Sequence, residues 1–339
     1  MNNAVSVNPV LVETTRGKIV ESRHRGAIAV VRSNGQLLAS WGDIDNPIYS
    51  RSSMKPFQTL ATLETDAFTA FDLGSKEVAL HAASHSGEAG HIEVISQWLE
   101  KIGLQESDLQ CGVQTPYWVM LNWARAFEAD KPRQLFNNCS GKHAGFLTAV
   151  QHKREDVSNY LSLQHPTQIS IRRLLSEMTE FDESLMTAST DLCRAPVYAI
   201  PLRNFAHGLA KIANPEQLSS KRADATQLLM NSMLEHPWLV AGTDRADTLL
   251  MQDESFIGFA KCGAEGFYAM AFPEHDIGVA IKIDDGADRA ASVAAVAVLK
   301  KLGVLSEQDV TRLENVGNPI LRTWEGIELG MIKAATTLS

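Results

Sequence analysis

Hydrophobic residues change their spacing along the chain near residue 53 and again near residue 255. Apolar stretches at 28–31 and 37–41 lie on either side of Asn34-Gly35, a pair that is typical of a tight turn between two β-strands. From about 53 to 240, apolar residues recur every three or four positions, which predicts helices. The predicted helices cover 56–63, 76–83, 92–102, 142–152, 168–178 and 223–234.

Beyond residue 255 the pattern again predicts strands. Three apolar segments, 255–262, 266–272 and 276–283, are separated by short Gly or Pro breaks, and a strong helix is predicted over 287–302. Strands at both ends with helices between them predict an α+β fold, in which N- and C-terminal strands build one mainly antiparallel sheet. No linker divides the 339 residues. We therefore expect a single domain, 1–339, with a sheet lobe of about 1–52 plus 255–339 and a mainly helical lobe of about 53–254.

The composition narrows the possible partners and compartments. Asp and Glu number 40 against 31 Lys and Arg, a net charge of -9, which argues against nucleic acid or an anionic membrane surface as the main partner. The four cysteines are too few and too scattered for a disulfide framework. The first residues lack the basic and apolar stretches of a secretory signal. We expect a soluble cytoplasmic protein that acts on a small molecule.

The first candidate for catalysis is the segment RSSMKPFQ at 51–58. Ser52 and Lys55 are three positions apart, which on a helix places their Cβ atoms about 5–6 Å from each other. A lysine can take the proton of a serine hydroxyl when burial or nearby cations favour the neutral amine. Pro56 disfavours helical angles at Lys55, so the helix is expected to begin only at Pro56. The alternative is that Ser52 or Ser53 caps a helix and the lysine is solvated.

Two further segments could complete such a site. AASHSGE, at 82–88, lies between two predicted helices and could present Ser84 as a second hydroxyl, while Ser86 could cap the following helix. FAKCGAEG, at 259–266, places Lys261 in an apolar strand, where it faces either solvent at a sheet edge or a polar cavity. The order Ser-x-x-Lys, serine loop, Lys-x-Gly is similar to that of the penicillin-recognising serine hydrolases.

A fourth segment, NNCSGKH at 137–143, raises the question of a metal. Cys139 with the later Cys193, and His143 nearby, suggest zinc, which takes four ligands or three ligands and a water. Two cysteines are too few to assign a structural zinc site, and buried inert thiols are the alternative.

Five motifs together resemble one protein family. RSSMKPFQ, AASHSGE, NNCSGKHAGFL, GFAKCGAEG and KIDDGADRA, in this order, are similar to the motifs of the L-asparaginase II family of rhizobial, thermolabile type. The resemblance covers about residues 10 to 330. It implies the fold of the serine β-lactamases and glutaminases, and hydrolysis of L-asparagine to L-aspartate and ammonia.

The resemblance also implies the catalytic residues. The family's two Ser-Lys pairs correspond here to Ser52 with Lys55 and to Ser84 with Lys261. The resemblance further implies a homodimer.

Zinc near the substrate is implied as well, held by Cys139, Lys142 and Cys193. The aspartate before the second of these cysteines corresponds to Asp191, and the arginine before the first serine corresponds to Arg51. We expect Asp191 to bind the ammonium group of the substrate, and Arg51 to hold a carboxylate or to lower the pKa of a lysine.

One difference from the family and three alternatives remain at this stage. Rhizobial members have a further cysteine that falls near 242–247, where this chain reads GTDRAD. A glutaminase would differ only in a pocket deeper by one methylene group, which gives about 1–3 kcal/mol of discrimination between the two substrates. A β-lactamase-like hydrolase or peptidase would need an open cleft. A non-catalytic, zinc-dependent ligand-binding protein would have no need of intact Ser-Lys pairs.

Overall fold

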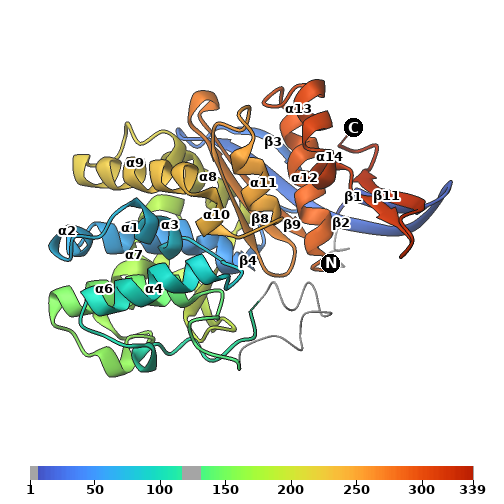
Figure 1. Cartoon of the computed structure of the whole chain (residues 1–339). Helices are drawn as coiled ribbons and strands as arrows, with labels where there is room; N and C mark the ends of the chain where they lie inside the picture. The colour runs from blue at the N-terminus through green and yellow to red at the C-terminus, as the bar shows by residue number, and fades with distance from the viewer. Residues whose placement is uncertain (1–6, 117–130, 339) are drawn as a thin grey trace. The chain divides into compact units, whose positions relative to one another are not determined.

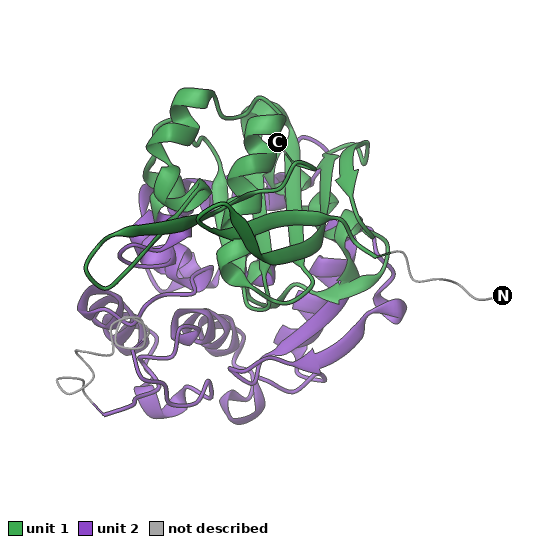
Figure 2. Cartoon of the chain, turned by 90° about the vertical axis from the view of Figure 1, so that its right-hand side faces the viewer, with its two compact units in different colours: residues 1–53, 200–214, 249–339 green, residues 54–199, 215–248 purple. Residues whose placement is uncertain are grey.

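The computed structural model describes residues 7–116 and 131–338. The chain forms two compact units, which Figure 2 shows in different colours. Unit 1 comprises 1–53, 200–214 and 249–339, and unit 2 comprises 54–199 and 215–248. Each unit therefore combines segments that lie far apart in the sequence. None of the helices in the described ranges is long and apolar enough to span a bilayer.

Unit 1 consists of an antiparallel sheet and the helices that pack on it (Figure 1). The strands of this sheet are β1 (Val10–Arg16), β2 (Ile19–Arg32), β3 (Leu37–Trp41), β7 (Phe259–Gly263), β8 (Phe267–Phe272), β9 (Ile277–Ile283), β10 (Ile320–Arg322) and β11 (Glu328–Ala334). The short strand β4 (Pro47–Tyr49) also lies in unit 1 but is not part of this sheet. Its helices are α8 (Leu202–Ala213), α12 (Asp288–Lys301), α13 (Glu307–Arg312) and α14 (Glu314–Gly317).

The large sheet joins strands from both ends of the chain, as the sequence predicts. Its strands pair in the order β10-β11-β1-β2-β9-β8-β7, and β3 pairs with β2 outside this path. The long strand β2 makes this possible, because its first half pairs with β1 and its second half pairs with β3 and β9. The predicted α+β class, with a mainly antiparallel sheet built from N- and C-terminal strands, is confirmed.

The hairpin predicted around Asn34-Gly35 is also confirmed. The N–H of Gly35 donates to the carbonyl of Arg32 at 3.0 Å, and Gly35 has φ +84°, a conformation that costs glycine little. The side chain of Asn34 accepts a hydrogen bond from the N–H of Gln36 at 2.9 Å. The turn is therefore stabilised by the chemistry that favours this residue pair in hairpins.

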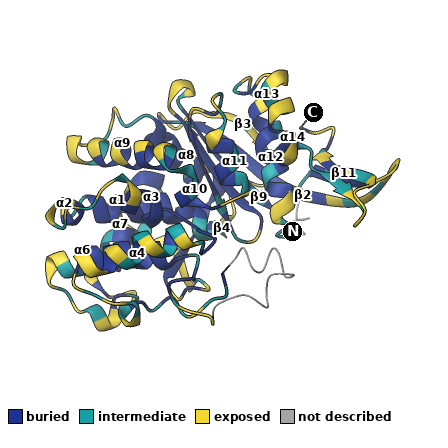
Figure 3. Cartoon of the chain, in the orientation of Figure 1, coloured by how far each residue is buried: buried dark blue, intermediate teal, exposed yellow. Residues whose placement is uncertain are grey.

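Helix α8 belongs to unit 1, although it comes from the part of the sequence in which a helical lobe was expected. It packs against β2, β8 and β9. Gly278 of β9 permits this contact, because a Cβ at that position would lie 2.1 Å from the backbone oxygen of Ala206. Helix α12 packs on β1, β8, β9 and β11, and β8 is buried along its whole length (Figure 3).

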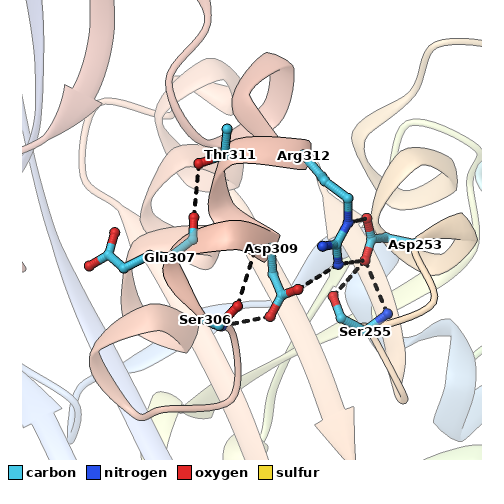
Figure 4. Close-up of polar contacts among 7 residues, drawn as sticks. All are labelled: Asp253, Ser255, Ser306, Glu307, Asp309, Thr311 and Arg312. Atoms are coloured by element: carbon cyan, nitrogen blue, oxygen red, sulfur yellow. Dashed lines mark hydrogen bonds and ion pairs between the residues drawn. The ribbon is translucent and has the colours of Figure 1, made fainter.

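Strand β7 begins later than the predicted segment 255–262, which is a correction to the sequence analysis. The N–H and the hydroxyl of Ser255 both donate to the carboxylate of Asp253, which closes a turn. The same carboxylate accepts two hydrogen bonds from Arg312 of α13, and Arg312 also contacts Asp309 (Figure 4). This network fixes the residues before β7 in a bent conformation.

Unit 2 is mainly helical. Its helices are α1 (Lys55–Leu63), α2 (Ala67–Ala70), α3 (Ser75–His81), α4 (Ala89–Lys101), α6 (Ser140–Lys153), α7 (Pro166–Thr179), α9 (Ser220–Glu235), α10 (Pro237–Val240) and α11 (Ala246–Gln252), the last of which runs on into unit 1. Six of them match the predicted helices with ends shifted by a few residues. The strands β5 (Thr187–Thr190) and β6 (Pro196–Pro201) lie in the segment predicted to be helical and were not predicted.

Two glycines of α6 allow this helix to pack closely on α3. A Cβ at Gly141 would lie 2.4 Å from the backbone oxygen of Leu80, and a Cβ at Gly145 would lie 2.4 Å from the ring of His81. His81 is fully buried, and its Nε2 lies 2.9 Å from the hydroxyl of Thr62 in α1. The packing of α1, α3 and α6 therefore fixes where the first turns of α1 and α6 lie within unit 2.

We predict that Gly145→Ala destabilises the protein. Alanine is the better helix former by about 0.5–1 kcal/mol, but forcing a methyl group into a packed core costs about 1–3 kcal/mol. The ring of His81 is fully buried and a Cβ at Gly145 would overlap it, so we expect the packing cost to dominate. The free energy of unfolding in urea measures the difference.

Gly74→Ala is the matched control, because the nearest atom to a Cβ there is the flexible carboxylate of Glu77 at 3.8 Å. We expect it to change the free energy of unfolding by about 1 kcal/mol or less. A gain in stability from Gly145→Ala would show that the two helices can separate without cost.

Candidate active site

The segment that carries Ser52 is a strained turn of unit 1. Arg51 has φ +51°, in the left-handed region that non-glycine residues rarely adopt. The N–H of Ser53 donates to the carbonyl of Ser50 at 3.0 Å, and the hydroxyl of Ser53 donates to the carbonyl of Lys261 at 2.8 Å. Ser53 thus ties the turn to β7. Neither Ser52 nor Ser53 caps α1, which begins without a side-chain cap.

Strand β7 lies close to this turn because of a glycine. A Cβ at Gly263 would lie 2.5 Å from the backbone oxygen of Ser50 and 2.9 Å from the hydroxyl oxygen of Ser53. Lys261, two residues earlier, is fully buried, and its amine donates to the carbonyl of Cys262 at 2.8 Å. The interpretation of Lys261 as a solvated edge lysine is therefore wrong. Unit 1 brings the backbone around Ser52 next to the strand that carries Lys261.

In unit 2, Lys55 is the first residue of α1, so the expected start at Pro56 is wrong by one residue. The missing N–H of a proline costs nothing in the first turn, where N–H groups have no partner within the helix. Lys55 is fully buried, and its amine donates to the hydroxyl oxygen of Ser84 at 2.9 Å and to the carbonyl of Ala83. This contact between Lys55 and Ser84 is a pairing that the sequence analysis did not include.

The loop that carries Ser84 is held by backbone hydrogen bonds. The N–H of Ser84 donates to the carbonyl of Val240 at 2.9 Å, and the N–H of His85 donates to the carbonyl of Asn138 at 3.2 Å. The hydroxyl of Ser86 donates to the carbonyl of Ala241 at 2.9 Å. Ser86 therefore does not cap the next helix, α4, which begins at Ala89.

The three residues implied as zinc ligands come together inside unit 2. The amine of Lys142, in the first turn of α6, donates to the sulfur of Cys193 at 2.9 Å. The sulfur of Cys139 lies within hydrogen-bonding range of Cys193 and 3.0 Å from the side-chain oxygen of Asn138, and the side chains of Cys139, Lys142 and Cys193 are all buried. Cys139 and Cys193 are free thiols, as are the other two cysteines.

The hydrogen bond from Cys139, together with the charge of Lys142, holds the pKa of Cys193 well below its ordinary value, at about 5, against the effect of burial. The same hydrogen bond and burial raise the pKa of Cys139. Burial alone would lower the pKa of Lys142, but the charge of Cys193 outweighs it and the pKa is raised. The cluster therefore combines a thiolate, a thiol and an ammonium group.

The two sulfur atoms and the nitrogen suit zinc once Cys139 and Lys142 have lost their protons, because zinc binds deprotonated sulfur and nitrogen ligands. In the described part of the chain, no three residues among His, Cys, Asp and Glu are grouped as a metal site, and the third member of this cluster is a lysine. Asp191 lies beside the cluster, with one carboxylate oxygen 3.9 Å from the sulfur of Cys193 and the other accepting the N–H of Leu192 at 2.9 Å.

The sequence motifs drew attention to residues of both units, but they did not predict all of the contacts within each unit. Lys142 contacts Cys193, and Lys55 contacts Ser84. In each pair the two partners are far apart in the sequence. His85 was passed over, although its ring lies fully buried beside Ser84. A histidine between two serines in a Gly-containing loop was the signal that could have drawn attention to it.

Comparison with known proteins places the chain in a family. The model that describes the family L-asparaginase II matches residues 12–334, nearly the whole chain. The chain belongs to the L-asparaginase II family, which confirms the resemblance carried by the five motifs. By family it is an asparaginase-like amidohydrolase that acts on a small molecule.

A search of curated proteins found no matching sequence. Solved structures that are similar include a β-lactamase of Mycobacterium bovis, with 14% identity and a TM-score of 0.44 over 81% of this chain and 94% of that one. Another is a Bacteroides dorei protein assigned provisionally as a β-lactamase, with 12% identity and a TM-score of 0.40 over 76% of this chain and 84% of that one.

Proposed function

We propose that this protein hydrolyses L-asparagine to L-aspartate and ammonia through a serine-lysine acyl-enzyme mechanism. Family membership supports the amidohydrolase class. The observation that carries the mechanism is the contact between the fully buried amine of Lys55 and the hydroxyl oxygen of Ser84, at 2.9 Å. A lysine amine kept from water and bonded to a serine hydroxyl supports Lys55 as the base of serine-lysine catalysis, while the choice of Ser52 as the nucleophile follows from the resemblance.

Lys55 is suited to the role of general base. Burial disfavours an ammonium and favours a neutral amine, which has two N–H donors and one lone pair. The amine of Lys55 donates to the carbonyl of Ala83 and to the hydroxyl of Ser84, and in the proposed mechanism the neutral amine accepts the proton of the nucleophile. Ser52 lies three residues before Lys55 in the same segment, and its hydroxyl is the nucleophile of the proposal.

The reaction then proceeds in two steps. The hydroxyl oxygen of Ser52 forms a bond to the side-chain amide carbon, and its proton passes to Lys55 and on to the leaving nitrogen, which departs as ammonia. Water attacks the resulting aspartyl ester, and cleavage of the ester bond returns the hydroxyl and releases aspartate. Ser84 and Lys261 relay protons in this second step, a role that draws on the resemblance alone.

Substrate groups away from the amide need charged partners. Asp191 is assigned to the α-ammonium group and Arg51 to the α-carboxylate, since charged hydrogen bonds give both strength and direction. Cys139, Lys142 and Cys193 would hold zinc. Zinc bound there would supply an electrophilic centre that orients the polar groups of the substrate.

We predict that Lys55→Met lowers kcat by at least about 10²–10⁴-fold, because methionine has a similar volume but cannot accept the proton. Ammonia release from asparagine measures the effect, with glutamine as the comparison substrate. Lys211→Met is the control, since Lys211 is also a buried lysine but lies in α8 of unit 1. Turnover close to that of the wild type in Lys55→Met would exclude this lysine as the base.

We predict that the wild-type protein, loaded with zinc and desalted, retains about one zinc per chain by elemental mass spectrometry. Replacing Cys139 and Cys193 together by alanine removes both sulfur donors and should abolish the bound metal. Cys111→Ala is the matched control, because Cys111 is a buried free thiol of the same unit. Stoichiometric zinc in the double variant would place the metal elsewhere.

A further inference from the structure

The loop from Ala82 to Glu88 is anchored to the start of α6 by the side chain of His85. The ring is fully buried, and it bridges two groups of unit 2. On one side, the N–H of Gly87 donates to Nδ1 at 3.1 Å. On the other side, Nε2 lies 2.9 Å from the hydroxyl oxygen of Ser140, the first residue of α6.

These partners fix the protonation of the ring. Because the N–H of Gly87 can only donate, Nδ1 of His85 has to be the nitrogen without a proton. The hydroxyl of Ser140 gives its own proton to the carbonyl of Leu135 at 2.9 Å, so its oxygen accepts from Nε2–H. His85 is therefore neutral, with its proton on Nε2, and both nitrogens have partners.

The surroundings hold the ring in this state and in this place. His85 stacks on His91 with 5.1 Å between ring centroids, and His91 stacks on Trp238 at 4.1 Å. Burial lowers the pKa of His85 well below its ordinary value, and the positive charge of Arg245 acts in the same direction.

The consequence concerns Ser84, which directly precedes His85. The amine of Lys55 reaches Ser84 from α1, and the ring of His85 ties the next residue to α6, where Lys142 and Cys139 meet Cys193. We propose that His85 is a positioning residue. By binding Ser140 in the first turn of α6, it holds the hydroxyl of Ser84 in a fixed position relative to the amine of Lys55 and to α6. This inference rests on the proposed function and adds to it a residue that does not touch the substrate.

Positioning of this kind affects turnover more than binding, since a displacement of about 1 Å in a reacting group can cost about 10²-fold in rate. We predict that Ser140→Ala and His85→Asn each lower kcat at least about tenfold and change KM by less than about threefold. Asparagine retains an acceptor for the N–H of Gly87 but cannot reach Ser140. His85→Gln, whose amide can donate to Ser140, should recover part of the lost kcat.

The chain offers a structural twin of His85 as control. His165 of unit 2 is also buried, accepts the N–H of Thr167 at Nδ1 and has Nε2 3.1 Å from the carbonyl of Asp156. It caps α7 and has no contact with Ser84 or α6 among those described. His165→Asn should lower Tm and leave kcat at the wild-type value.

The decisive comparison is kcat against Tm across the four variants. If Ser140→Ala and His85→Asn lose only Tm, as His165→Asn does, then His85 is a structural histidine and the inference is wrong. Ser140→Ala removes only one oxygen atom, so kcat and Tm can still be compared in this variant even if a histidine variant does not fold. If the wild-type protein and His165→Asn release no ammonia from asparagine, it is the proposed function that fails.

Discussion

The burial of one amine is the constraint on which this account depends. Lys55 begins a helix, has no exposed surface and gives its hydrogen bonds to a carbonyl and to the hydroxyl of Ser84. Placing a lysine there is expensive for folding, because an ammonium loses its hydration. A neutral amine avoids most of that cost, and the proposed mechanism uses such an amine as its general base. The burial that costs folding free energy is therefore also what the proposed chemistry needs.

The packing of the other helices of unit 2 holds the residues around the contact between Lys55 and Ser84 in place. The glycines of α6 let this helix lie against α3, at whose end the Ser84 loop begins. That close approach places Ser140 where the ring of His85 can bond it. It also places Lys142 against Cys193, which lies far along the chain between β5 and β6. One packing arrangement therefore serves both the serine loop and the thiol cluster.

Sequence reasoning was successful where the local sequence determines the local structure. The hairpin at Asn34-Gly35 and the long helices follow from turn chemistry and from apolar spacing. Sequence reasoning failed where contacts formed only in the folded chain determine the backbone conformation. Lys55 is helical despite Pro56 because the first turn of a helix tolerates proline, and Ser255 lies in a turn because its partner is Asp253. The role proposed for His85 depends on the hydroxyl of Ser140, which donates to the carbonyl of Leu135 and can therefore accept from His85. The spacing of residues in the sequence does not reveal such a contact.

Trapping of the acyl group tests the central claim most directly. The protein would be incubated with an electrophilic analogue of asparagine, and the labelled serine would be mapped by peptide mass spectrometry in the wild-type protein and in Lys55→Met. The account predicts a label on Ser52 that forms in the wild type and is nearly absent, at the same exposure, from Lys55→Met. Equal labelling of the two proteins, or a label on a residue other than Ser52, would contradict it.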